Sequence, residues 1–171
     1  ALKAFIKPKS IDLFERHGVF TKVELHARYN IWLEIYEKVL DIEPKALAEM
    51  VRTQVRPAAI EYQAEIAGGL EILKDLVDSK AVELVDEAIE DRKQLLAGLT
   101  ADIFYIRKNL KQMEELLKKA DTLDPEAKAA MYYSELKPHM LHIRRHVDAL
   151  ESVMPDSMWV LPKYREMLFI S

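Results

Sequence analysis

The sequence predicts an all-α fold, and more narrowly an elongated antiparallel helical bundle with long, partly coiled-coil-like helices and an apolar C-terminal tail. Apolar residues recur at spacings of three and four along most of the 171 residues, a pattern typical of helices that bury one face. No segment shows the strict alternation that a half-buried strand would need. We expect residues 1–154 to form one bundle domain and residues 155–171 to form a docking tail of the same domain.

Short-range signals place the first two helices. The first should cover residues 10–17 and stop at Gly18, which suits the left-handed position after a helix end. The second should begin at Thr21, because Thr21 and Glu24 form a T-x-x-E capping box, and it should run to about Asp41. The residues that this second helix should bury are Leu25, Tyr29, Trp32, Tyr36 and Val39.

A third helix should open at Pro44, because a proline in the first turn sacrifices no hydrogen bond. Farther along, Pro57 should leave the Thr53 carbonyl without its donor and bend the axis. Gly68 and Gly69 indicate either close backbone packing or a break in this helix, and the sequence does not decide between the two. The expected apolar stripe consists of Leu47, Val51, Val55, Ala58, Tyr62, Ile66, Gly69, Leu73 and Leu76.

The fourth helix carries the longest periodic run. It should start near Ser79, and only Arg92 interrupts its apolar seam. A 3.5-residue period held for about five heptads predicts a left-handed supercoiled helix that packs along its whole length. At about 40 residues it would reach ~60 Å. The seam residues are Val82, Val85, Ile89, Leu96, Leu99, Ile103, Ile106, Leu110, Met113 and Leu117.

The fifth helix should be capped by Asp124 and opened by Pro125, with a second bend at Pro138. Its expected seam is Leu136, Met140, Ile143, Val147, Leu150 and Met154. After Pro155 large apolar residues crowd into a short tail, and because free termini usually fray, we expect this tail to be docked on its own bundle or on a neighbour. The interaction candidates are Trp159, Leu161, Tyr164, Met167, Leu168 and Phe169.

Composition excludes several classes of function. The formal net charge of −4 argues against a nucleic-acid-binding protein, which normally carries a basic excess. No apolar run approaches the roughly 18 residues that cross a bilayer, and the lack of cysteine suits a reducing cytoplasm. Phosphate-binding glycine loops, HExxH and GxSxG motifs do not occur. We therefore expect no catalytic and no cofactor-binding residue in these 171 residues.

One helical face carries ligand-type side chains. Glu135, His139, His142 and His146 are spaced by four, three and four residues and should share a face that a divalent metal such as zinc would fit. Each, however, precedes a seam residue by one position, where histidines commonly border a packing stripe. Packing or an interface is the favoured interpretation, and metal binding is a minor alternative. Di-iron chemistry is excluded, because no histidine here follows a glutamate by three positions.

Several stretches resemble the C-terminal region of type III glutamine synthetases. They are residues 14–20 (FERHGVF), 24–29 (ELHARY), 33–36 (LEIY) and 56–63 (RPAAIEYQ). The chain's ending is similar to the Trp-Pro-x-Pro-x-Tyr-x-x-Met-Leu-Phe pattern of that family, and it departs from the pattern at Val160, where the family would have proline. The matching residues are Trp159, Pro162, Tyr164, Met167, Leu168 and Phe169.

The resemblance implies a helical appendage of a larger enzyme. The parent would be a glutamate–ammonia ligase that uses ATP and Mg²⁺ or Mn²⁺ and proceeds through a γ-glutamyl phosphate. It would combine a β-grasp domain with a barrel-like catalytic domain in a dodecamer of two hexameric rings. The family's catalytic residues lie in those upstream domains and match no position here. The partners implied are the catalytic portion of the same enzyme and neighbouring subunits.

Two rival functions remain open at this point. A free-standing helical interaction module would form a defined dimer from these residues alone. A metal-binding bundle would use the His139 face, and its thermal shift with zinc would be lost in His142→Ala. Neither explains the aromatic ending as well as the resemblance does, so a non-catalytic, structural domain in assembly or regulation is the principal expectation.

Overall fold

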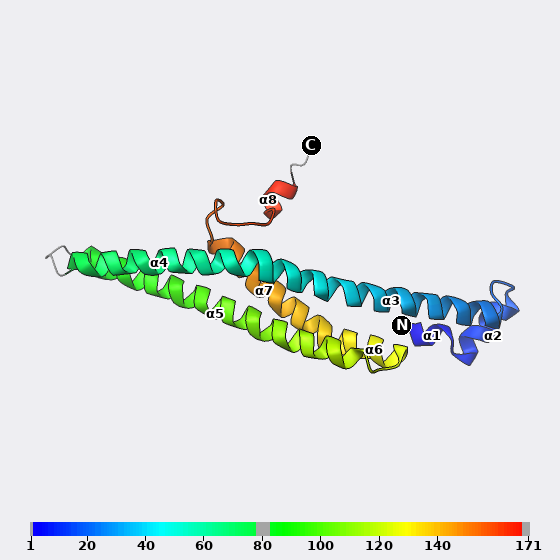
Figure 1. Ribbon diagram of the computed structural model, residues 1–171. Coiled ribbons are helices and arrows are strands. Elements are labelled where there is room, and N and C mark those ends of the chain that lie inside the picture. Colours follow the sequence, from blue (N-terminus) through cyan, green and yellow to red (C-terminus); the bar gives the residue numbers. More distant parts are fainter. Residues whose placement is uncertain (1, 78–82, 169–171) are drawn as a thin grey trace.

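The computed structural model describes residues 2–77 and 83–168, and these residues form an all-α fold without a β-strand (Figure 1). The elements are α1 (Leu2–Phe5), α2 (Pro8–Arg16), α3 (Lys22–Met50), the π-helical segment η1 (Val51–Val55), α4 (Arg56–Val77), α5 (Glu83–Ala120), α6 (Pro125–Met131), the π-helical segment η2 (Tyr132–Leu136), α7 (Lys137–Val153) and α8 (Tyr164–Met167). The predicted all-α class with long helices is therefore confirmed, and the coiled-coil-like character of the helices stays a prediction.

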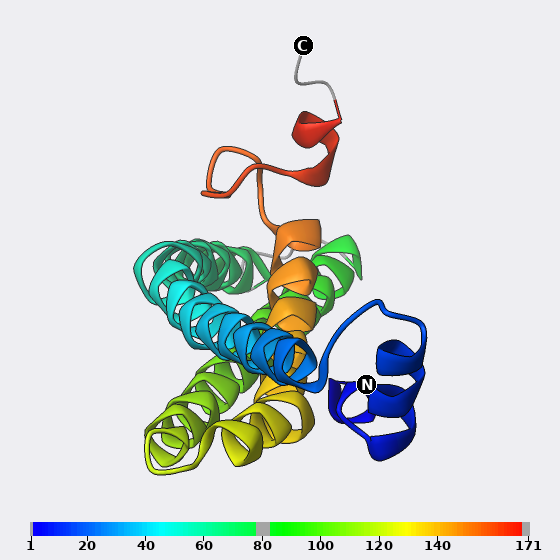
Figure 2. The same ribbon diagram turned by 90° about the vertical axis from the view of Figure 1, so that its right-hand side faces the viewer.

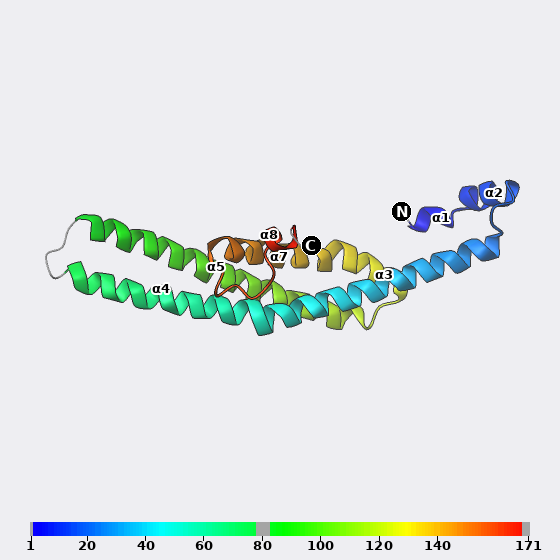
Figure 3. The same ribbon diagram turned by 90° about the horizontal axis from the view of Figure 1, so that it is seen from above.

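Three long rods make up the body of the molecule. α3, η1 and α4 form one nearly continuous rod, α5 returns antiparallel beside it, and α6, η2 and α7 form a third rod that packs on α5 (Figures 1 and 3). The two short helices α1 and α2 lie beside the start of α3, apart from the C-terminal tail (Figure 2). The result is an elongated bundle rather than a compact ball.

Local capping signals fix the helix ends that the sequence predicted. Gly18 adopts a φ of 63° just after α2, as a left-handed helix stop requires. At the start of α3, the Thr21 amide donates to Glu24 Oε2 at 2.8 Å, and the Glu24 amide donates to Thr21 Oγ1 at 3.3 Å. Asp124 Oδ1 accepts from the Ala127 amide at 3.1 Å and caps α6. Helix α1 had no counterpart in the prediction.

Pro44 does not open a helix, and that prediction is wrong. It lies inside α3, which continues without interruption to Met50, and its ring is fully buried. A proline inside a helix leaves the carbonyl four residues earlier, here that of Leu40, without its usual donor. Burial of the ring in the bundle compensates for that loss, because removing apolar surface from water is favourable.

Each remaining interior proline follows a widened helical turn. The π segment η1 ends two residues before Pro57, and η2 ends two residues before Pro138. In each case the amide of the intervening residue donates to the first carbonyl of the π segment, from Arg56 to Val51 and from Lys137 to Tyr132. A π turn is a known way for a helix to accommodate such a disruption. α3 and α4 meet at an angle in Figure 3, as the bend predicted at Pro57 requires.

The two glycines do not break α4, which runs through both. An added Cβ on Gly69 would stand 2.7 Å from Nη1 of Arg92 on α5. Arg92, the one polar residue in the seam of α5, therefore fills the space that the missing side chain of Gly69 leaves. Of the two interpretations left open by the sequence, close packing is the correct one, and the partner is a side chain rather than a backbone.

The core runs along the length of the rods. Its fully buried members include Leu25, Val51, Val55, Leu99, Ile106, Met113, Tyr132, Leu136, Ile143 and Leu150. In α3 the predicted burial of Leu25 and Tyr29 is confirmed and Tyr36 is half-buried, but Trp32 and Val39 are exposed. The helix instead buries Leu33 and Leu40, because the rest of the bundle covers a face rotated away from Trp32 and Val39.

Candidate interaction surfaces

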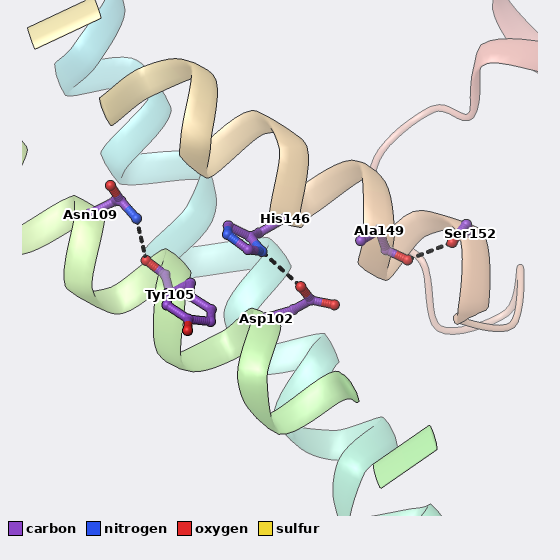
Figure 4. Close-up of polar contacts among 6 residues, drawn as sticks. All are labelled: Asp102, Tyr105, Asn109, His146, Ala149 and Ser152. Atoms are coloured by element: carbon purple, nitrogen blue, oxygen red, sulfur yellow. Dashed lines mark hydrogen bonds and ion pairs between the residues drawn. The ribbon is translucent and has the colours of Figure 1, made fainter. Parts of the chain in front are cut away.

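The histidine face of α7 pairs with α5. His146 Nδ1 lies 2.8 Å from Asp102 Oδ1, and the His146 ring stacks on Tyr105 with centroids 5.1 Å apart (Figure 4). Both partners of the polar pair are about four-fifths buried. The polar pair and the stacked rings together set the register of α7 along α5.

His139, about two helical turns before His146, makes a similar contact with α5. His139 Nδ1 lies 2.9 Å from Asn109 Oδ1, while the Asn109 amide nitrogen donates to the Tyr105 carbonyl at 2.9 Å. Because the Asn109 oxygen is thereby the acceptor, we assign the hydrogen to His139 Nδ1. Burial, with the nearby His142, lowers the pKa of His139, which favours the neutral ring.

The remaining two ligand-type residues point elsewhere. Glu135 reaches Lys119 at 4.0 Å, and His142 is exposed. Over residues 2–77 and 83–168, no three His, Asp or Glu side chains converge as metal ligands. The four residues lie on one rod, Glu135 in η2 and the three histidines in α7, but Glu135, His139 and His146 have separate partners and His142 is exposed. Metal binding by this face therefore has no geometric support within the described residues.

The tail after α7 packs partly on its own bundle. Trp159 is only 8% exposed and belongs to the main core, against which Met158 and Leu161 also pack. Lys163 secures the turn, because its Nζ lies 3.4 Å from the carbonyls of Glu151 and Met154 and 2.6 Å from Asp156 Oδ1. Trp159 and Leu161 are thus contacts within this chain.

The far end of the tail is different. Met167 is 49% exposed and Leu168 is 78% exposed. Phe169 lies outside the described residues, and for Tyr164 the structure describes the backbone only. Of the six predicted interaction candidates, Met167 and Leu168 are therefore the two whose described side chains offer apolar surface to a partner.

An open, mostly apolar hollow of about 390 Å³ separates α1, α3 and α6. At its polar edge Tyr29 donates to Glu126 Oε1 at 2.7 Å, and Lys3 pairs with the other carboxylate oxygen at 2.8 Å. Hydrogen bonds from Lys3 and Tyr29 lower the pKa of Glu126, and the same bond raises the pKa of Tyr29. These contacts attach the N-terminal segment to the bundle, and the ion pair with Lys3, being exposed, contributes little energy.

The largest feature that the sequence prediction missed is a row of exposed apolar residues on α3. Ile31, Ile35, Val39 and Ile42, named here the α3 stripe, are 54%, 54%, 43% and 64% exposed. Spacings of four, four and three place them on one helical face. The signal was present in the sequence, because α3 carries apolar residues on two faces where a surface helix has one.

Comparison with known proteins identifies the family. Residues 1–88 match the family model described as the glutamine synthetase C-terminal domain, which is just over half of the chain. The chain belongs to this family. The predicted resemblance to the C-terminal helical domain of a type III glutamine synthetase is confirmed.

Three curated relatives match nearly the whole chain. It is 32% identical to a glutamine synthetase of Butyrivibrio fibrisolvens over 96% of its length, and 30% identical to a glutamine synthetase of Bacteroides fragilis (strain YCH46) over 88%. It is 28% identical to a type-3 glutamine synthetase of Dictyostelium discoideum over 99%. The chain spans only 20–23% of the length of these relatives.

The family match covers the N-terminal half of the described fold. None of the helices described in residues 2–77 and 83–168 is long and apolar enough to cross a membrane. The match to the family model ends inside α5, so it contains α1 to α4 and the whole α3 stripe.

Proposed function

We propose that this glutamine synthetase C-terminal domain is non-catalytic and structural, and that it serves the assembly or regulation of a larger homo-oligomeric enzyme. The catalytic portion of that enzyme would join ammonia to glutamate with ATP and Mg²⁺ or Mn²⁺, in the cytoplasm. The domain would contact that portion and neighbouring subunits. The relatives, four to five times longer than this chain, support a parent of this kind.

One observation supports the proposal: two of the histidines, the side chains most suited to acid–base catalysis, bridge two helices of the bundle. His146 pairs with Asp102 and His139 pairs with Asn109, so that both histidines join α7 to α5. In both rings Nδ1 is held by a side chain of α5, so each histidine contributes to the contact between these two helices. This arrangement favours architecture over catalysis.

The metal and nucleotide of the parent would bind outside this domain. Glu135, His139 and His146 contact different partners, His142 is exposed, and the described residues offer no set of three converging ligands. A divalent cation held with ATP requires converging carboxylates or similar oxygen donors. We propose that both groups bind in the catalytic portion, and no reaction step is assigned to these residues.

The test uses the full-length enzyme with His139→Ala and His146→Ala, and His142→Ala as the matched exposed control. Each buried histidine hydrogen bond is worth about 1 kcal/mol, so amide hydrogens of α7 should exchange roughly fivefold faster, while kcat for glutamine formation stays within twofold. The control should change neither quantity. A kcat loss of tenfold or more with unchanged exchange would show that these histidines act in the chemistry, and the proposal would fail.

A further inference from the structure

Within residues 2–77 and 83–168, no segment covers the apolar α3 stripe. Ile31, Ile35, Val39 and Ile42 cover about three helical turns, and isolated exposed apolar residues are ordinary, but a contiguous row is not. The bundle cannot bury these residues by rotating α3, because the opposite face already holds Leu33 and Leu40 in the core. The helix is therefore apolar on two sides, and the described bundle buries only one of them.

The polar border of the stripe has the character of a protein interface. On one flank, Lys38 pairs with Glu34 at 2.6 Å and Lys45 pairs with Asp41 at 2.6 Å. These four charges cancel, so the flank carries no basic excess that would attract a nucleic acid or an anionic membrane. An apolar centre with a neutral polar rim is the anatomy of a protein–protein contact.

The N-terminal segment borders this surface at Phe5. The Phe5 ring on α1 packs on Trp32 with centroids 5.0 Å apart, and Trp32 adjoins Ile31 on α3. Phe14 on α2 packs on Phe5 at 5.3 Å and continues the same aromatic cluster. Phe5 therefore lies at the border of the stripe, whereas Leu2 packs on the other side of α3 against Tyr29 and Leu33. In a C-terminal domain, the bulk of a polypeptide four times longer precedes this N-terminal segment.

We infer that the α3 stripe is the docking surface for the catalytic portion of the synthetase, an inference that rests on the proposed function. Its partner is an apolar protein surface upstream of residue 1 in the full-length enzyme. The family model covers the entire stripe, which fits a contact that belongs to the domain as a whole. The tail is then a separate contact, because Trp159 and Leu161 lie on their own bundle.

Site-specific photocrosslinking in the assembled full-length enzyme tests the inference. A benzophenone amino acid replaces Ile35, and the matched control replaces Ile72 on α4, which is 65% exposed and outside the stripe. We expect position 35 to crosslink at least tenfold more than position 72, to peptides from outside residues 1–171. Crosslinks to residues 1–171 of a second copy, or a yield at position 35 no higher than at position 72, would overturn the inference.

A pair of charge substitutions gives a second readout. Ile42→Glu should reduce the crosslink from position 35 at least fivefold, whereas Ile72→Glu, at almost equal exposure, should leave it unchanged; circular dichroism would verify that both remain helical. An unchanged crosslink in Ile42→Glu would contradict the inference. A failure here is distinct from failure of the proposed function, because the histidine variants of α7 test the structural role without involving the stripe.

Discussion

At the scale of single residues, Gly69 and Arg92 illustrate how a helix pair admits a charge into an apolar seam. The guanidinium of Arg92 occupies the position where a side chain on Gly69 would begin. Gly68, in contrast, has nothing within 4 Å of an added Cβ. The structure therefore explains why position 69 is glycine, whereas it gives no reason for glycine at position 68.

Alanine substitutions should separate the two glycines. Gly68→Ala should raise the free energy of unfolding by about 1 kcal/mol, because alanine is the better helix former and meets no neighbour. Gly69→Ala should raise the free energy of unfolding by less, because the guanidinium of Arg92 must move aside. Urea denaturation of both variants measures the difference. Equal stabilisation would show that Arg92 does not depend on the space at Gly69.

Tyr132 gives the core a dependence on alkaline pH. Burial, with the carboxylates of Asp41, Asp121 and Glu37 nearby, raises the pKa of Tyr132 to about 12. Between pH 10 and 12 the unfolded chain loses this proton while the folded chain keeps it, so stability falls as the pH rises. The loss attributable to Tyr132 should be about 1 kcal/mol between pH 9 and pH 11.

Comparison with Tyr132→Phe isolates this contribution, because other groups titrate equally in both proteins. Between pH 9 and pH 11, the unfolding free energy of the wild type should fall by about 1 kcal/mol relative to that of Tyr132→Phe. A difference that stays constant from pH 9 to pH 11 would show that Tyr132 titrates as an exposed tyrosine does.

At the scale of elements, the helix ends that depend on contacts between nearby residues were predicted best from the sequence. The capping box at Thr21, the stop at Gly18 and the cap at Asp124 depend on contacts within a few residues, and all three are observed. Pro44 was misjudged because the same residue type starts one helix and lies inside another. Its position in α3 is set by burial against the bundle, which no local pattern reveals.

The choice of buried face was also beyond the reach of the sequence. α3 has two apolar faces, and periodicity alone does not say which one the other rods cover. Trp32 and Val39 were consequently assigned to the core, whereas Ile31, Ile35 and Ile42 were not recognised as a surface. In α7 the periodicity did locate the histidines on one face, but their partners on α5 lie 30 and 44 residues away in sequence.

The tail is an element whose two halves should behave differently. Truncating the full-length enzyme after Pro155 removes Trp159 from the core and should destabilise the domain by about 3–5 kcal/mol, the usual cost of losing a buried tryptophan. Truncation after Lys163 keeps Trp159 and Leu161 and should leave the stability of the domain nearly unchanged. Denaturation of the two truncated enzymes makes the comparison.

Oligomer size distinguishes the second role of the tail. If the exposed Met167 and Leu168 contact the catalytic portion or a neighbouring subunit, truncation after Lys163 should weaken assembly while preserving the helical domain. Native mass spectrometry measures this directly. Unchanged oligomer size and melting temperature after both truncations would contradict a docking role for the tail.

At the scale of the whole molecule, the rods form a long arm, and the two surfaces proposed to contact partners lie at separate places on it. Figure 2 shows the N-terminal helices and the C-terminal tail on different sides of the bundle, and Phe5 of α1 packs on Trp32 at the border of the α3 stripe. Such an arm can hold more than one neighbour at fixed distances, because helices in a packed bundle are stiff. This geometry suits a domain that contributes to assembly.

The most direct test of the account is the size in which the chain occurs in its native source. An antibody raised against these 171 residues should detect a band several-fold heavier than 19.8 kDa that co-purifies with γ-glutamyl transfer activity. That result would place the domain in a larger synthetase. A band near 20 kDa without this activity would contradict the account, and a free-standing helical interaction module would take its place.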